Sequence, residues 1–389
     1  MITSDVARPA QLFYRASMQF IDLQSQQDRL RAEIDRGIAD VLAHGQYILG
    51  PEVRTFEERL ATFVGAERAL GCANGTDAIL LPLLAWGIGP GDAVFCPSFT
   101  YCATAEVIAL ADAVPVFVDV DRDTYNMDPA SLARAIAEVK AKGALVPRAV
   151  IAVDLFGQIA DYPALEPIVR AEGMTLISDC AQGLGSTLDG RHPLHWADVQ
   201  TTSFFPAKPL GCYGDGGAVM TDDAELATLI ESLRFHGRGM EPYDTARIGL
   251  NSRLDTIQAA VLLAKMGVFE DEIAARNRIA ARYTDGLKDH VLRTPHVADG
   301  VVSTWAQYTI EVPDPDGFCA ALKSDGIPVA RYYPRPTHRQ TAYGHYPVSG
   351  NGLPNTMDAA DHVVSLPMHA YLGEADQDRI MDAARAALR

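Results

Sequence analysis

The segment SFFPAKPLGCYGDGG, residues 203–217, holds a lysine in an unusual setting. Lys208 lies between Pro206 and Pro209 and is followed by several glycines, so its amine stands on a backbone of restricted freedom. An amine fixed in this way can condense with an aldehyde cofactor to form a Schiff base. An ordinary solvated loop lysine is the alternative, and the segment alone leaves both interpretations open.

A carboxylate follows the apolar run 174–178. Asp179 would end that strand, where it could pair with a pyridinium nitrogen and keep the ring protonated as an electron sink. Gln182, three residues further on, could form a hydrogen bond with the phenolic oxygen of the ring. The alternative is that Asp179 only caps the next helix.

Two further motifs follow predicted strands. In CANGTDA, residues 72–78, Gly75 allows close backbone approach and Thr76 adds a hydroxyl at a helix N-terminus, which attracts phosphate. Ser203 could supply a second phosphate hydroxyl. An Asn-Gly turn capped by Thr76 explains the same residues without a ligand.

In PSFTY, residues 97–101, Tyr101 could stack on a flat ring or be a packed aromatic.

These side chains require a scaffold that brings strand ends together. Short apolar runs alternate with helical stretches, and the predicted strands are residues 68–72, 93–96, 114–118, 149–155 and 174–178. This alternation predicts an α/β fold with a mainly parallel sheet covered by helices on both faces. Two more runs, 199–204 and 217–221, predict a hairpin that closes the sheet. Ligands in such folds gather at the C-terminal ends of the strands.

Other parts of the chain are helical or form a smaller unit. Residues 24–43 predict an amphipathic helix, a second helix opens at Pro51, and a long one covers about 255–287. A smaller α/β domain is predicted from two apolar runs, 307–312 and 329–332, and from two helix starts, at Pro315 and Glu374.

Composition excludes several classes of protein. The chain has 389 residues, 48% hydrophobic and 21% charged, so it is not predominantly disordered. Its net charge of −17 disfavours nucleic acid and anionic membranes as partners. Six scattered cysteines, the lack of a signal peptide and the lack of a long apolar stretch predict a cytoplasmic protein. His192 and His195 have no obvious third ligand, so we expect no metal.

The motifs NGTDA, FTY, DxAQ, SFFPxK and GDGG, in this order, resemble the sugar aminotransferases of the DegT family. The resemblance runs from about Met18 to the C-terminus and includes HGQYILGPEV, RLDTIQAA and SLPMHAYL. It implies a fold type I pyridoxal phosphate (PLP)-dependent transferase, with a mainly parallel seven-stranded sheet between helices. The expected divisions are an N-terminal extension (1–17), a large PLP-binding domain (18–250), and a linking helix with a small C-terminal domain (251–389).

The resemblance implies roles for the cofactor side chains. Lys208 would form the Schiff base with pyridoxal 5'-phosphate and then move the proton between substrate and cofactor. Asp179 would hold the pyridine nitrogen and Gln182 the phenolic oxygen, while Tyr101 would stack on the ring.

The resemblance also implies a phosphate site and a partner. Gly75, Thr76 and Ser203 would hold the cofactor phosphate, and Asn251 would reach the phosphate from a neighbouring subunit. The expected assembly is a homodimer with shared active sites.

The substrates implied are glutamate, which becomes 2-oxoglutarate, and a keto sugar nucleotide. The expected acceptor is the 3-keto group of a UDP-linked 2-acetamido-2-deoxy-hexuluronic acid, used for O-antigen or other bacterial surface polysaccharide. Arg253, Tyr332 and Tyr333 are the expected substrate residues, since a guanidinium fork suits a carboxylate. Tyr332 stands where a histidine is expected. The alternatives are a 4-keto-6-deoxy sugar aminotransferase of the perosamine type, a PLP-dependent sugar dehydratase, and a PLP-binding regulator.

Overall fold

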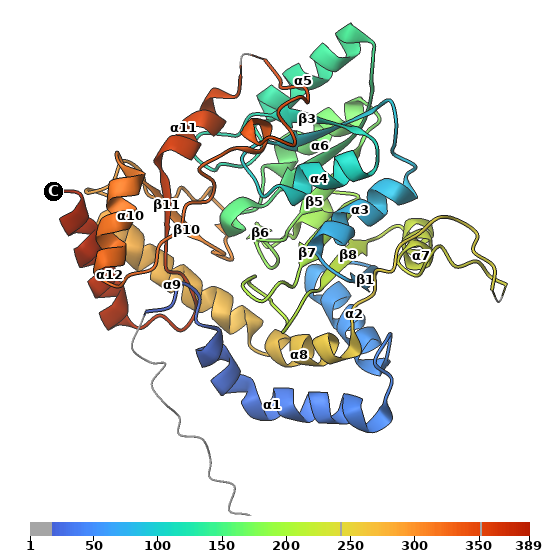
Figure 1. Ribbon diagram of the computed structural model, residues 1–389, viewed down its shortest axis with the longest axis horizontal. Coiled ribbons are helices and arrows are strands. Elements are labelled where there is room, and N and C mark those ends of the chain that lie inside the picture. The colour runs from blue at the N-terminus through green and yellow to red at the C-terminus, as the bar shows by residue number, and fades with distance from the viewer. Residues whose placement is uncertain (1–17, 242, 351) are drawn as a thin grey trace, which may run out of the picture.

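The computed structural model describes residues 18–241, 243–350 and 352–389, so the predicted extension 1–17 lies outside the described residues. Its centre is a seven-stranded sheet in the order β1-β8-β7-β5-β4-β2-β3 (Figure 1). The strands are β1 (Arg68–Cys72), β2 (Asp92–Pro97), β3 (Val114–Val118), β4 (Val146–Val153), β5 (Thr175–Asp179), β7 (Val199–Ser203) and β8 (Gly217–Thr221). β8 runs antiparallel to β1 and β7, and the pairs from β7 to β3 are parallel. The mainly parallel seven-stranded sheet is confirmed. The predicted hairpin is formed by β7 and β8, but it does not close the sheet, because β1 pairs with the outer side of β8.

Helices cover both faces of this sheet (Figure 1). The covering helices are α3 (Gly75–Ala85), α4 (Ala103–Leu110), α5 (Pro129–Lys142), α6 (Tyr162–Ala171) and α7 (Ala224–Leu233). Neighbouring strand residues point to opposite faces: Phe95 packs in the core under α5 and α6, and Val94 packs in the core under α3 and α4. The strands therefore need apolar residues at consecutive positions, which explains their continuous apolar runs.

The N-terminal helices lie against the first part of a linking pair (Figure 1). α1 (Leu23–His44) and α2 (Pro51–Val64) both pack against α8 (Thr256–Met266), and α9 (Phe269–Leu287) follows. The long helical segment predicted over about 255–287 is helical but divided into two helices, because Gly267 caps α8 and Val268 leaves the helical region with φ −122°. Glycine is a poor helix former, and Gly267 is the residue directly before the break at Val268.

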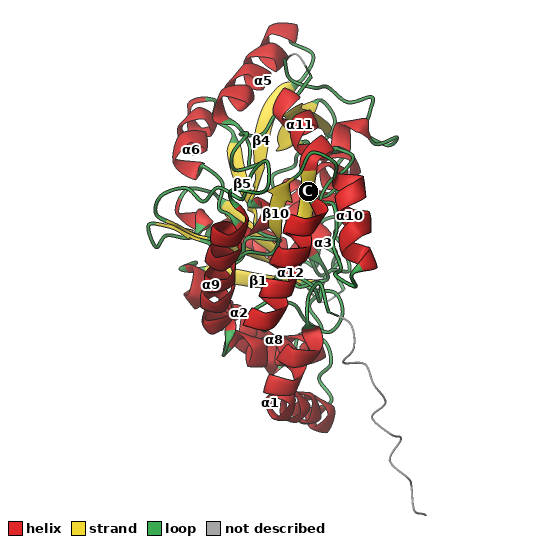
Figure 2. Cartoon of the chain, turned by 90° about the vertical axis from the view of Figure 1, so that its left-hand side faces the viewer, coloured by secondary structure: helices red, strands yellow, loops and turns green. Residues whose placement is uncertain are grey.

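The C-terminal part has its own hydrophobic core, built from α9, β10 (Tyr308–Glu311), α10 (Pro315–Ser324), β11 (Val363–Leu366) and α12 (Glu374–Ala387). β10 and β11 pair antiparallel, α11 (Pro354–His362) precedes β11, and α12 packs against both α9 and α10 (Figure 2). The two-residue strands β6 (Thr187–Leu188) and β9 (Val301–Val302) form a separate pair. The boundary expected between residues 250 and 251 stays a prediction.

The apolar run 329–332 is not a strand, which corrects the sequence-based expectation. Ala330 forms a single bridge to Ser365 of β11. The chain then enters a segment with Pro334 and Pro336, which have no N–H to donate to a sheet.

Candidate active site

The predicted site residues lie at the C-terminal ends of the central strands. Asp179 ends β5 and Ser203 ends β7, while Gly75 begins α3 shortly after β1. Tyr101 lies between β2 and α4. These positions share one edge of the sheet, because β1, β2, β5 and β7 run in the same direction. This is the edge at which open parallel sheets bind ligands.

The loop that carries Lys208 is held tightly. The Lys208 N–H donates to the Phe205 carbonyl at 2.8 Å. Gly211 packs so closely on the loop that a Cβ there would lie 2.4 Å from the Pro206 carbonyl oxygen. The buried Lys265 Nζ donates to the Gly211 carbonyl at 2.6 Å. The backbone beneath Lys208 is therefore fixed from several sides.

The amine of Lys208 and the carboxylate of Asp179 form the charged centre. Lys208 is half-buried, and within the described chain its amine has no hydrogen-bond partner. Burial lowers the pKa of Lys208, and the nearby negative charge of Asp179 opposes this shift. Asp179 is 5% exposed and accepts hydrogen bonds from Thr104 Oγ1 and the Ala181 N–H, both at 3.1 Å. Burial raises the pKa of Asp179, while the Ala181 N–H, Lys208 and Thr104 act in the opposite direction.

Gln182 connects the turn after β5 to the C-terminal part of the chain. Its Nε2 donates to the Tyr333 hydroxyl at 3.2 Å, and its Oε1 accepts from the Phe156 N–H at 2.8 Å. Tyr332 lies next to Tyr333, with ring centroids 5.6 Å apart. The structure thus brings both predicted substrate tyrosines near the predicted cofactor residues.

Sequence reasoning missed two groups in this region, the Thr104 hydroxyl and the Phe156 N–H. Thr104 follows Tyr101 by three residues on the first turn of α4, so helical spacing could have identified it. No sequence signal points to the Phe156 N–H, because its contact with Gln182 spans two different strand ends.

A narrow cradle forms between the start of α3 and the end of β7. A Cβ at Gly75 would lie 2.5 Å from Ser203 Cβ, so only glycine allows this approach. Asn74, rather than Thr76, caps the helix by accepting the Asp77 N–H at 2.8 Å. The N–H groups of Gly75 and Thr76 precede the first bonds within the helix and remain able to bind an anion.

Asn251 and Arg253 flank Ser252, which contacts the segment before α3. Between them, Ser252 Oγ accepts the Ala73 N–H at 3.2 Å. Asn251 is exposed and accepts a hydrogen bond from Arg253, whose guanidinium lies 4.7 Å from the Phe235 ring centroid. In the part of the chain that the structure describes, Arg253 has no ion pair, and no hydrogen bond joins Asn251 to the cradle. A local acidic partner for Arg253 is therefore absent from the described residues.

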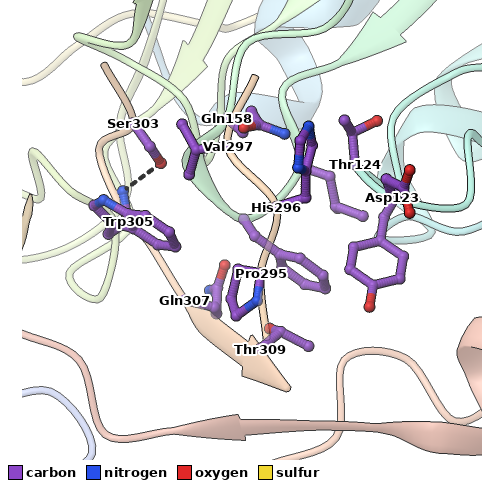
Figure 3. Close-up of a pocket in the computed structure, with 13 residues that line it drawn as sticks. Asp123, Thr124, Gln158, Pro295, His296, Val297, Ser303, Trp305, Gln307 and Thr309 are labelled. Carbon is purple, nitrogen blue, oxygen red and sulfur yellow. Dashed lines mark hydrogen bonds between the residues drawn. The ribbon is translucent and has the colours of Figure 1, made fainter. Parts of the chain in front are cut away.

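Figure 3 shows a pocket lined in part by Phe156, the residue whose N–H binds Gln182. It has a volume of about 20 Å³, enough for about one water molecule. Its lining residues are Asp123, Thr124, Tyr125, Leu155, Phe156, Gln158, Pro295, His296, Val297, Ser303, Trp305, Gln307 and Thr309. It includes none of the predicted site residues, so it is not the candidate active site.

The described residues 18–241, 243–350 and 352–389 contain no group of three or more His, Cys, Asp or Glu side chains placed to hold a metal ion. Nor do they contain a helix with the length and apolar character needed to cross a bilayer.

The residues at this edge fit pyridoxal phosphate. The Lys208 amine is close enough to Asp179 for their charges to interact, which suits a cofactor that carries both an aldehyde and a pyridine nitrogen. The Gly75–Ser203 cradle at the α3 N-terminus suits its phosphate.

Comparison with known proteins identifies the family. The family model described as "DegT/DnrJ/EryC1/StrS aminotransferase family" matches residues 28–385. A relative in Pseudomonas aeruginosa, UDP-2-acetamido-2-deoxy-3-oxo-D-glucuronate aminotransferase, is 47% identical over 92% of this chain and 97% of its own length. A relative in Acidithiobacillus ferrooxidans, UDP-N-acetyl-3-dehydro-alpha-D-glucosamine 3-aminotransferase, is 38% identical over 95% of this chain and 97% of its own.

Solved structures give the same result. The crystal structure of a DegT/DnrJ/EryC1/StrS aminotransferase from Brucella abortus is 52% identical, with a TM-score of 0.94, and the match covers 95% of this chain and 99% of that one. The family model and the relatives both span more than nine-tenths of the chain. The chain therefore belongs to the DegT/DnrJ/EryC1/StrS family of aminotransferases.

Proposed function

We propose that this aminotransferase moves an amino group from glutamate to the 3-keto group of a UDP-linked 2-acetamido-2-deoxy-hexuluronic acid. The observation that carries the aminotransferase chemistry is the Lys208 amine on its fixed loop near the buried Asp179 carboxylate. The choice of sugar is supported by the 47% identical Pseudomonas aeruginosa relative, whose name specifies a 3-oxo uronate.

Pyridoxal phosphate, when bound, supplies the electron sink through which an amino group passes between two substrates. Lys208 would hold the cofactor through its amine and would accept and return a proton at Nζ. The lowered pKa of Lys208 supports this role, because a neutral amine is needed to accept a proton. Asp179 would hold the pyridine nitrogen and keep it protonated, and Thr104 donates a hydrogen bond that orients Asp179.

The remaining residues hold the cofactor in place. Gln182, oriented by the Phe156 N–H and Tyr333, holds the phenolic oxygen. Tyr101 stacks on the ring. The residues proposed to hold the phosphate are Gly75, Thr76, Ser203 and the partner-supplied Asn251.

Arg253, Tyr332 and Tyr333 are proposed to bind substrate. Arg253 offers a guanidinium without an acidic partner in the described chain, which suits a uronic acid carboxylate. Glutamate also carries carboxylates, so the same cation can serve both half-reactions in turn.

The proposed working form is a homodimer with shared sites. Exposed aromatic or large apolar side chains lie in or beside the site segments: Tyr101 is 58% exposed and Phe205 is 51% exposed. Asn251 is exposed and makes no hydrogen bond to its own cradle, which supports its use in a neighbouring site.

A role in O-antigen or other surface polysaccharide synthesis, in the cytoplasm, completes the proposal. Six free cysteines are consistent with a reducing compartment.

An absorbance experiment with defined substrates tests this function. Glutamate should convert the yellow cofactor to its amine form, and a UDP-linked 3-keto uronate should restore the yellow form. A 4-keto-6-deoxy sugar nucleotide serves as the comparison substrate. Restoration by the 4-keto sugar alone would overturn the proposed acceptor, and no response to glutamate would overturn the aminotransferase reaction itself.

A further inference from the structure

A second buried carboxylate lies beneath the turn that carries Asp179. Asp154 follows β4 and is 0% exposed. Its Oδ1 accepts hydrogen bonds from the Ala160 N–H and the Tyr162 hydroxyl, both at 2.9 Å. Its Oδ2 accepts from Cys180 Sγ at 2.8 Å and from Ser178 Oγ at 3.3 Å. Four donors thus converge on one carboxylate, which is the arrangement that an ionised carboxylate can fully use.

The contacts of Asp154 tie it to the proposed cofactor residues. Its N–H donates to the Asp179 carbonyl at 3.0 Å. A Cβ at Gly183 would lie 2.4 Å from Asp154 Cβ, so the turn after β5 packs directly on this side chain. That turn carries both Asp179 and Gln182, although no role proposed above uses Asp154.

The protonation state of Asp154 changes near neutral pH. Burial raises the pKa of Asp154 to about 7, against the opposing hydrogen bonds from Cys180, the Ala160 N–H and Tyr162. The negative charge of Asp179 raises it further. Burial also raises the pKa of Cys180 and of Tyr162, so both groups stay neutral donors. Asp179 is therefore the charged neighbour that acts on Asp154, and Asp179 in turn interacts with the charge of Lys208.

We propose that Asp154 is a positioning residue of the cofactor site, whose carboxylate holds the 178–183 turn and places a second negative charge behind Asp179. That second charge favours the protonated ring nitrogen. The inference rests on the cofactor assignment and not on the identity of the sugar. When Asp154 is ionised, the site binds pyridoxal phosphate more tightly than when it is protonated.

The test compares the dissociation constant of pyridoxal phosphate for the wild-type chain and Asp154→Asn at pH 6 and pH 8, without glutamate or sugar. The variant should bind about tenfold more weakly at pH 8, because one nearby charge is lost. The ratio of the two dissociation constants, variant to wild type, should approach one at pH 6, because the wild-type carboxyl is itself mostly neutral there. A role limited to packing would give the same ratio at both pH values and would overturn the proposal.

Asp119→Asn is the matched control. Asp119 is also a buried carboxylate, 4% exposed, but it accepts the N–H groups of Asn355 and Thr356 at the start of α11. The dissociation constant of pyridoxal phosphate for Asp119→Asn should be close to the wild-type value at both pH 6 and pH 8. An equal, pH-dependent loss in this control would overturn the specific role of Asp154.

A cysteine pair keeps the inference falsifiable if Asp154→Asn does not fold. Cys180→Ala removes one donor to Asp154, so the rise in affinity with pH should move to higher pH. Cys180→Ser retains a donor and should keep the wild-type profile. An unchanged profile in Cys180→Ala would count against the proposal, and a wild-type chain that binds no pyridoxal phosphate would overturn both the proposal and the proposed function.

Discussion

Lys208 is the residue on which the proposed chemistry depends most directly. Lys208→Ala removes the amine but no hydrogen bond within the described chain, so the fold should remain intact. We expect transamination to fall by at least about a thousandfold, because the nucleophile and the proton carrier are the same group. Single-turnover kinetics and circular dichroism measure activity and folding separately. Clear transamination by the folded variant would contradict the assignment of Lys208.

Arg253 can be tested in a single half-reaction that starts from the amine form of the cofactor. Arg253→Ala should weaken the transition state for an acidic keto sugar by about 2 to 5 kcal/mol, since a buried carboxylate loses its cation. For a neutral 6-deoxy keto sugar, the same substitution should lower kcat/KM much less. The measurement is kcat/KM for each sugar.

Arg238→Ala is the matched control for this prediction, because its guanidinium also lies against Phe235, at 5.7 Å from the ring centroid. Arg238→Ala should leave kcat/KM for both sugars nearly unchanged. Equal losses on both sugars in Arg253→Ala would reject Arg253 as the residue that binds the sugar carboxylate.

Asp154 also predicts how stability varies with pH in the cofactor-free protein. Its folded pKa of about 7 lies above the usual value, so the folded state binds the proton more tightly than the unfolded state. This contribution is fully present below about pH 4 and is lost as pH rises to about 7. The unfolding free energy of wild type, relative to Asp154→Asn, should therefore fall between pH 4 and pH 7. Urea unfolding at both pH values measures it, and a constant difference would contradict the raised pKa.

At the scale of elements, the contact between α3 and β7 determines the cradle. Gly75→Ala places a methyl group 2.5 Å from Ser203 Cβ, so the helix start or the strand end has to move. Pyridoxal phosphate should bind at least about tenfold more weakly, because its phosphate depends on N–H groups at that helix start. The dissociation constant of the cofactor is the measurement.

Gly89→Ala is the control for the same change elsewhere. A Cβ at Gly89 would lie 3.6 Å from its nearest neighbour, the Ala111 carbonyl oxygen, which is an ordinary contact. This variant should bind the cofactor as wild type does. Wild-type affinity in Gly75→Ala as well would show that the cradle does not hold the phosphate.

At the scale of the whole molecule, the proposed shared site predicts complementation between two inactive chains. Lys208→Ala and Asn251→Ala each impair every site of their own homodimers. A heterodimer should contain one site with neither change, so mixed chains should regain part of the wild-type rate. The measurement is turnover after subunit exchange, with exchange verified by mass. Full exchange without any recovered activity would exclude a site that takes Asn251 from the partner.

The sequence by itself determined most of the local elements and the chemistry-bearing residue types; the segments 255–287 and 329–332 are the exceptions described above. Apolar runs predicted the strands of the central sheet to within a few residues, because a strand buried on both faces needs consecutive apolar side chains. Pro51 marked a helix start, as its missing N–H requires. Motif order was enough to identify the family before any contact was known. The roles of the individual site residues stay predictions.

The tertiary structure decided what depends on contacts between distant parts of the chain. β10 pairs with β11 across more than 50 residues, so the local run 329–332 could not show that another segment takes that place. Thr104 reaches Asp179, and Asp154 lies beneath the turn after β5, because separate strand ends meet at one edge of the sheet. Periodicity encodes which face of an element is buried, whereas the neighbours it meets follow only when the elements pack together.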